Sequence, residues 1–157
     1  MATTYVSTKA ASGVQPRVHV HDDTSYCEFD IAAAVATAAN GGGGAGGTAF
    51  VINDVVQMVK VASGMVVVDV ILSVDALESN AAIVVAVGDG SEDDRFITAS
   101  TIGRSSAAGV ASLNNHAGHL YAYTGDDTID FKVTTAGTAG QATTGKVRLS
   151  VRTTPQQ

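Results

Sequence analysis

The chain of 157 residues has no tryptophan, only one cysteine and two prolines, and its aromatic residues make up 5%. With Cys27 alone, no disulfide can form within the chain. Charged residues account for 15%, below the roughly 25% that is usual in soluble domains. A small domain with so little charge usually has much of its surface covered by something else, so these shortages favour a protein that works in contact with others.

Positive charge and long apolar runs are also scarce. Nine Lys and Arg stand against fifteen Asp and Glu, for a formal net charge of −6. Nucleic-acid binding needs clustered positive charge, which is absent, so we expect no nucleic-acid partner. The most apolar run, Met65–Val74, has Asp69 in its middle and is half the length of a membrane-spanning helix, which needs about 20 residues. It is therefore expected to be a core strand, and no membrane partner is expected.

Two low-complexity segments stand out from the rest of the chain. Residues 1–16 are small and polar, have no periodicity and end at Pro16, which predicts an extended N-terminal arm. They also lack the apolar segment of a secretion signal. Residues 17–157 are expected to form a single β-sandwich domain that contains a Gly/Ala-rich loop at 40–49.

Apolar residues recur at every second position along most of this domain. The alternation predicts about eight strands, drawn from nine candidate segments, with a long loop over 101–118. The candidate segments are 17–21, 26–31, 54–61, 66–75, 81–87, 95–98, 119–123, 129–133 and 146–152. Alternation on one face only is typical of antiparallel sheets. The fold class is therefore predicted to be all-β, an antiparallel β-sandwich or jelly roll with an extended N-terminal arm.

The same alternation predicts which residues form the core. They are the apolar members of each strand: Val66, Val68, Val70, Leu72, Ile83, Val85, Ile129, Phe131, Val147 and Leu149. Asp130 and Lys132 fall on the opposite face of their strand and are expected to point outward.

His19, His21 and Glu28 are the candidate metal ligands. Two His at i and i+2 on a strand project the same way, which suits two ligands of one ion, and Glu28 on a neighbouring strand offers a third. This spacing resembles the first metal motif of the cupin jelly rolls. Glu28 lies later than that motif requires, however, and no second motif follows. The simpler interpretation is a polar strand face, so no metal or other cofactor is expected.

Other polar clusters do not form a recognisable catalytic motif. Gly88–Asp94 and Gly125–Asp127 are acidic, but their spacing is that of turns and not of a calcium-binding loop. No serine lies in a nucleophile motif, and no pair of carboxylates is flanked by aromatic residues. We therefore do not expect an enzyme.

Three segments resemble a known family when they are taken in order. They are Asp54–Ala76 (DVVQMVKVASGMVVVDVILSVDA), Val85–Phe96 (VAVGDGSEDDRF) and Tyr123–Val133 (YTGDDTIDFKV). Together they resemble the head decoration, or cement, proteins of tailed bacteriophages, over about residues 54–151. Each motif is ordinary strand and turn chemistry, so the likeness lies in their order and spacing.

The resemblance implies a structural protein of the virion. Such proteins bind the outer surface of the phage head, commonly as oligomers on local symmetry axes, and tie neighbouring major capsid subunits together. The expected partners are therefore the major capsid protein and further copies of this chain, as a trimer rather than a dimer. Two alternatives remain: another virion β module (head fibre base, tail component or glycan binder) and a cupin-like metal-binding protein.

The arm has a role of its own in this hypothesis. Residues 3–14 have no apolar face and cannot become ordered by burying themselves, whereas an extended segment can add to an exposed sheet edge. The arm is thus predicted to be a tether that binds a neighbouring subunit, through the residues Thr3, Thr4, Tyr5, Val6, Ser7 and Val14.

Overall fold

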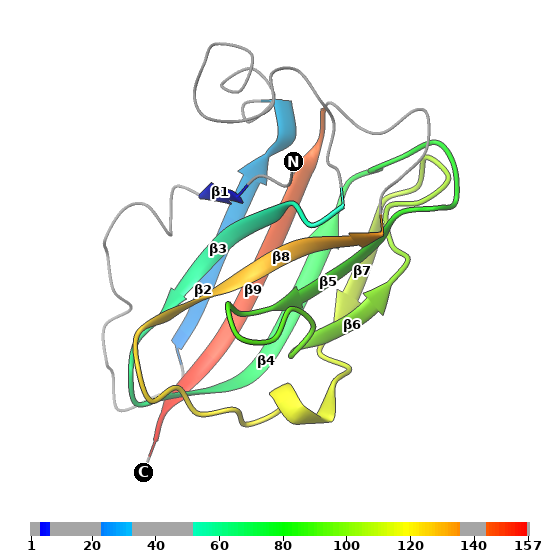
Figure 1. Cartoon of the computed structure of the whole chain (residues 1–157). Helices are drawn as coiled ribbons and strands as arrows, with labels where there is room; N and C mark the ends of the chain where they lie inside the picture. Colours follow the sequence, from blue (N-terminus) through cyan, green and yellow to red (C-terminus); the bar gives the residue numbers. More distant parts are fainter. Residues whose placement is uncertain (1–3, 7–22, 33–51, 136–143, 157) are drawn as a thin grey trace.

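A computed structural model of the chain describes residues 4–6, 23–32, 52–135 and 144–156 (Figure 1). Nearly all of the regular structure is β. The strands are β1 (Thr4–Val6), β2 (Asp23–Asp30), β3 (Val55–Val61), β4 (Met65–Val74), β5 (Val84–Gly88), β6 (Ile97–Ser100), β7 (Gly109–Ser112), β8 (Asp127–Thr135) and β9 (Lys146–Pro155), and one 3₁₀ helix, η1 (His116–Gly118), precedes β8.

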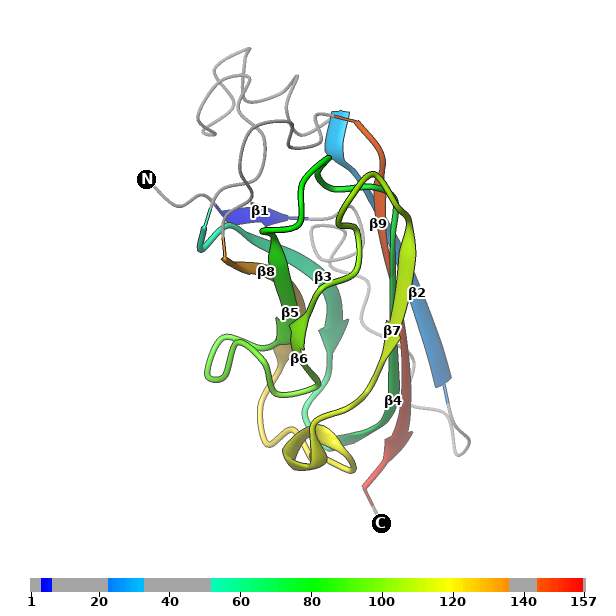
Figure 2. The same cartoon turned by 90° about the vertical axis from the view of Figure 1, so that its right-hand side faces the viewer.

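The strands form two sheets that pack face to face, as Figure 2 shows edge-on. The five-stranded sheet has the order β1-β3-β8-β5-β6, and the four-stranded sheet has the order β2-β9-β4-β7. All pairs are antiparallel except β1 with β3, which is parallel. The predicted all-β antiparallel sandwich is confirmed.

The core lies between the two sheets and is filled by the alternating apolar residues. On β8, for example, Ile129, Phe131 and Val133 are fully buried, and on β9 so are Val147 and Leu149. On β2, Cys27 and Phe29 are also buried in the core. One cluster of buried side chains links both sheets, so each sheet removes the apolar face of the other from water.

The predicted core is wrong at one end of β4. Val66 and Val68 are only half-buried, whereas Met65 and Val67 are buried. The cause is a register shift between Val67 and Asp69 in the pairing of β4 with β9. A bulge inserts one residue and reverses which side chains face inward. After the bulge, the residues of β4 that were predicted to face inward do so, and Val70 is buried.

The segment predicted as a long loop over 101–118 holds more structure than expected. β7 runs through it and pairs with β4, although only one of its four residues is large and apolar. Conversely, the strand predicted at 119–123 is reduced to a single bridge between Val66 and Ala122. The predicted strand at 17–21 and the Gly/Ala-rich loop at 40–49 lie outside the described residues.

We expect Phe131→Ala to lower the free energy of unfolding by about 3–5 kcal/mol, because Phe131 is fully buried between the sheets and its loss leaves a cavity. Denaturant unfolding followed by circular dichroism measures the change. Ile52→Ala, at a half-exposed position, is the matched control and should change stability far less. An unchanged unfolding midpoint for Phe131→Ala would show that the core is assigned wrongly.

Candidate functional site

Part of the predicted arm lies on the edge of the five-stranded sheet. Thr4–Val6 forms β1 and pairs in parallel with the start of β3, with Tyr5 opposite Val56. The edge that receives this strand belongs to the same chain. Thr3, Ser7 and Val14 lie outside the described residues. Thr4–Val6 therefore pairs within its own chain, and the contact of the arm with a neighbouring subunit stays a prediction.

Glu28 is engaged in an ion-pair cluster, and the other two candidate metal ligands, His19 and His21, lie outside the described residues. The two carboxylate oxygens of Glu28 accept hydrogen bonds from Lys146 Nζ at 2.5 Å and from Arg148 Nε at 2.9 Å. These bonds, that from Lys146 foremost, hold the pKa of Glu28 below its ordinary value.

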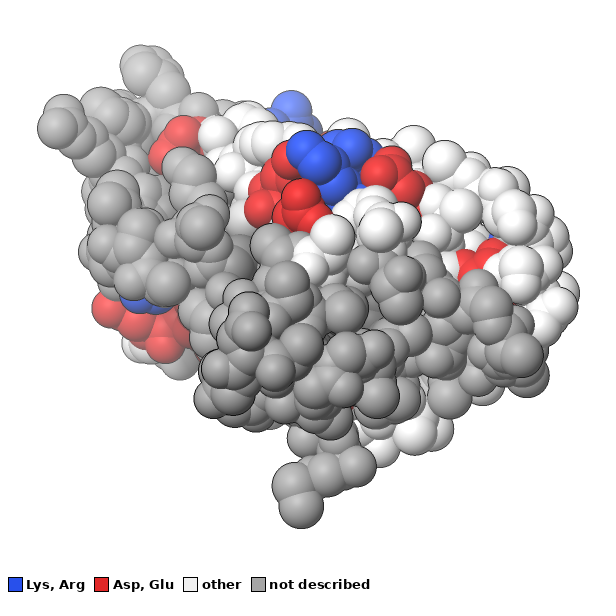
Figure 3. Space-filling view, turned by 90° about the horizontal axis from the view of Figure 1, so that it is seen from above, with Lys and Arg blue, Asp and Glu red and all other residues white. Residues whose placement is uncertain are grey.

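The cluster joins three strands of the four-stranded sheet on its outer face. Arg148 on β9 also donates to Asp75, just after β4, at 2.9 Å, while Glu28 lies on β2. Figure 3 shows basic side chains bordered by acidic ones at this end of the molecule. Within the described ranges, no group of three or more His, Cys, Asp or Glu side chains is placed to hold a metal ion.

The acidic turn after β5 is held together by its own first carboxylate. Asp89 is 2% exposed and accepts hydrogen bonds from the backbone N–H groups of Ser91 and Glu92, from Arg95 Nε at 2.6 Å and from the Tyr123 hydroxyl at 3.1 Å. Burial alone would raise the pKa of Asp89, but these bonds, led by that from Arg95, lower it below its usual value. The turn is therefore a rigid structural element.

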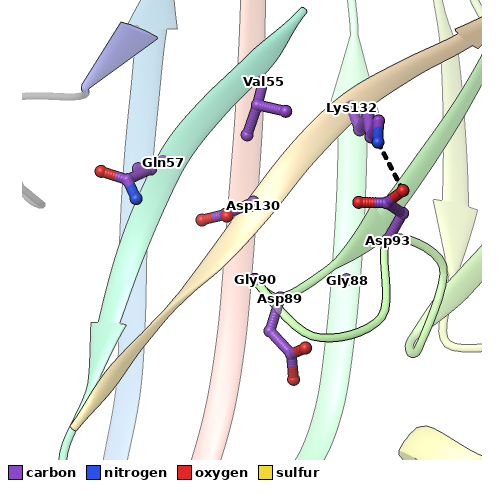
Figure 4. A pocket seen from close by; sticks show the side chains of 8 residues that line it. All are labelled: Val55, Gln57, Gly88, Asp89, Gly90, Asp93, Asp130 and Lys132. Carbon is purple, nitrogen blue, oxygen red and sulfur yellow. Dashed lines mark hydrogen bonds and ion pairs between the residues drawn. The ribbon is translucent and has the colours of Figure 1, made fainter. Parts of the chain in front are cut away.

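This turn folds back over the outer face of the five-stranded sheet and leaves a shallow cavity of about 210 Å³ (Figure 4). Gly88 is required there, because a Cβ atom would lie 2.0 Å from the Glu92 carbonyl oxygen. An ion pair between Lys132 and Asp93 joins β8 to the turn. The cavity is lined by Val55, Gln57, Gly88, Asp89, Gly90, Asp93, Asp130 and Lys132.

Asp130 is the unexpected residue in this cavity. It lies on the outward face of β8, as predicted, yet it is only 7% exposed. Burial, together with the nearby charges of Asp127, Asp89 and Asp93, raises the pKa of Asp130 to about 7. The alternation along β8 gave the direction of this side chain. It could not reveal that a turn about 40 residues earlier in the chain covers it.

Chemically, the cavity offers carboxylates that already have structural partners. Asp89 is held by Arg95, and Asp93 by Lys132. The cavity residues include no Ser, Cys or His that such a carboxylate could activate.

The described part of the chain has no helix that is both long and apolar enough to cross a membrane.

We expect Asp130→Asn to raise the thermal midpoint at pH 8 and to have little effect at pH 4. A carboxyl whose pKa is raised by folding binds its proton more tightly in the folded state, so it lowers stability as the pH rises from about 4 to 7. Asparagine mimics the protonated carboxyl at every pH. Thermal unfolding across this range measures the difference, and Asp94→Asn controls for the loss of one charge. Parallel pH profiles for wild type and Asp130→Asn would contradict the assignment.

Comparison with known proteins gives a match at the level of structure. No protein-family model matches the chain, and no curated protein matches its sequence. A chain of the capsid of Ralstonia phage GP4 has a TM-score of 0.70 at 22% identity, with 98% of this chain and 99% of that chain covered.

Two further capsid structures contain similar chains. One is the capsid asymmetric unit of cyanophage Pam1, with a TM-score of 0.64, 22% identity and coverage of 90% of this chain and 94% of that one. The other is the acidic stable capsid of Helicobacter pylori bacteriophage KHP30, with a TM-score of 0.55, 18% identity and coverage of 87% and 89%. The chain therefore has a fold that is shared, over nearly its whole length, with chains of three phage capsid structures.

Proposed function

We propose that this chain is a structural protein of a phage virion that binds the outer surface of the head and stabilises contacts between major capsid subunits. The observation that carries the proposal is the likeness to a chain of the Ralstonia phage GP4 capsid, which spans nearly the full length of both chains. The order of sequence motifs from Asp54 to Val151 supports the decoration role independently.

The use of charge in the chain is consistent with a structural role. Asp89, Asp93 and Glu28 are each paired with basic side chains of the same chain, so these carboxylates stabilise turns and sheets. A net charge of −6 also disfavours adhesion to DNA. We infer that the chain is not an enzyme.

The N-terminal arm is proposed to act as a tether to a neighbouring subunit. β1 is only three residues long and is held by pairing with β3 alone, through backbone contacts of a kind that any exposed strand edge can offer. Ordering the arm costs about 1–2 kcal/mol of backbone entropy per residue, so its partner contact must be extensive. Once the sandwich has docked, the arm binds at high effective concentration, which strengthens the attachment.

The proposal is tested by adding purified chain to mature heads prepared without it from the phage that encodes it. We expect it to bind on the outer surface in a fixed ratio to the major capsid protein, and to raise the temperature at which heads release their DNA. Binding ratios from sedimentation and DNA release followed by dye fluorescence measure both effects. Failure to bind the heads would refute the decoration role.

Removal of residues 1–15 tests the tether. The truncated chain should still fold and lose only the small circular dichroism signal of β1, because the other eight described strands lie after residue 15. It should leave the heads at a lower temperature or denaturant concentration. Tyr5→Pro, which removes one backbone N–H from β1, should shift release in the same direction by a smaller amount. Unchanged occupancy and head stability for the truncated chain would show that the sandwich alone binds.

A further inference from the structure

The distribution of acidic residues along the chain is uneven. Although the net charge is −6, residues 95–125 contain no Asp or Glu. Their two formal charges are directed inward: Arg95 pairs with Asp89, and Arg104 donates to the carbonyl oxygens of Ile83 and Ala82. Acidic turns lie directly before and after this segment, which is the longest of the stretches in the chain that contain no Asp or Glu.

The fold gathers this segment on one flank of the sandwich. It supplies β6, at the edge of the five-stranded sheet, β7, at the edge of the four-stranded sheet, and η1. Both edge strands lie toward the viewer in Figure 2. The exposed residues of 95–125 are here called the acid-free flank. Apart from Val110 and Leu120, they are Ala, Gly, Ser, Thr, Asn and His.

The acid-free flank displays the two most exposed large apolar side chains of the described residues. Val110 on β7 is 64% exposed and Leu120 is 57% exposed. Edge strands of monomeric proteins are usually protected by charged residues or proline, since an open edge can pair with another chain. β7 has the sequence GVAS and carries neither, so apart from its short length of four residues nothing in the strand opposes association.

Leu120 is held in an unfavourable conformation with its side chain outward. Its φ of 61° lies in the left-handed region, which glycine and asparagine tolerate better than leucine. The position is fixed on both sides, because Leu120 N–H donates to the Val67 carbonyl and Val67 N–H donates to the Tyr121 carbonyl, both at 2.9 Å. A leucine that is strained and exposed does not stabilise the isolated fold, which points to a role in contact.

We propose that the acid-free flank is the surface through which copies of this chain contact one another, with the flank turned toward the symmetry axis of a homo-oligomer. Each copy carries a charge of −6, so copies that meet through their acidic surfaces repel each other. The acid-free flank avoids this repulsion and buries Val110 and Leu120. The inference deepens the proposed function, since it gives the homo-oligomer of that proposal its interface.

The geometry of the flank suits a closed ring of copies, of which a trimer is the smallest. The flank presents two different edges, β6 from one sheet and β7 from the other. In such a ring the β6 side of one copy faces the β7 side of the next, so every copy uses both edges. Small side chains between the edges allow the backbones to approach closely.

Sedimentation velocity of the purified full chain at micromolar concentration tests the inference without any capsid. The wild type should sediment as a homo-oligomer. Leu120→Asn should weaken association about tenfold or more by removing a buried leucine, while its thermal midpoint in the monomeric state stays the same or rises because the backbone strain is relieved. Val110→Lys should give a monomer with unchanged circular dichroism.

The matched control is Tyr26→Lys, which makes the same kind of change at a 52% exposed position on β2, at the opposite edge of the four-stranded sheet. It should keep the wild-type mass. The inference would be overturned if the wild type sedimented as a monomer. It would also be overturned if the chain with both flank substitutions kept the oligomer mass of the wild type, or if Tyr26→Lys alone dissociated the oligomer. If the wild type associates but does not bind heads, the proposed function fails while the interface stands.

Discussion

The structure depends on the packing of two sheets through alternating small and β-branched apolar residues. Without tryptophan and with few aromatic side chains, the core is built mainly from Val, Ile and Leu, which remove their apolar surface from water only when both sheets are in place. Polar interactions then hold the turns and the strand pairs that the apolar packing does not fix by itself. Asp89 and Arg95 lock the turn after β5, and Glu28 with Arg148 joins β2 to β9.

The alternation of apolar and polar residues predicted the sandwich, because it can be recognised in each strand without knowing which strand is its partner. It gave the buried face of β8 correctly, through Ile129 and Phe131. It was wrong at the start of β4, where the bulge after Val67 depends on pairing with β9, a strand some 80 residues later. It missed the burial of Asp130 for the same reason, because a distant turn covers that residue.

The composition of residues 3–14 predicted an extended arm that could add to a sheet edge, but it could not show that Thr4–Val6 would pair with β3 of the same chain. Glu28, one of the candidate metal ligands, accepts hydrogen bonds from Lys146 and Arg148. The sequence could not show this, because those basic residues lie far along the chain. The acid-free flank was readable as a gap in the acidic residues between Asp94 and Asp126. Only the fold shows that this segment forms both sheet edges on one side.

The central claim is that the chain is a component of the outer surface of a phage head. The most direct test is its copy number and accessibility in purified intact particles of the phage that encodes it, measured by quantitative mass spectrometry and by labelling with an antibody that cannot enter the shell. We predict a copy number in a fixed ratio to the major capsid protein, with all copies accessible. Absence from the particles, or copies that are labelled only after the shell is opened, would contradict the account.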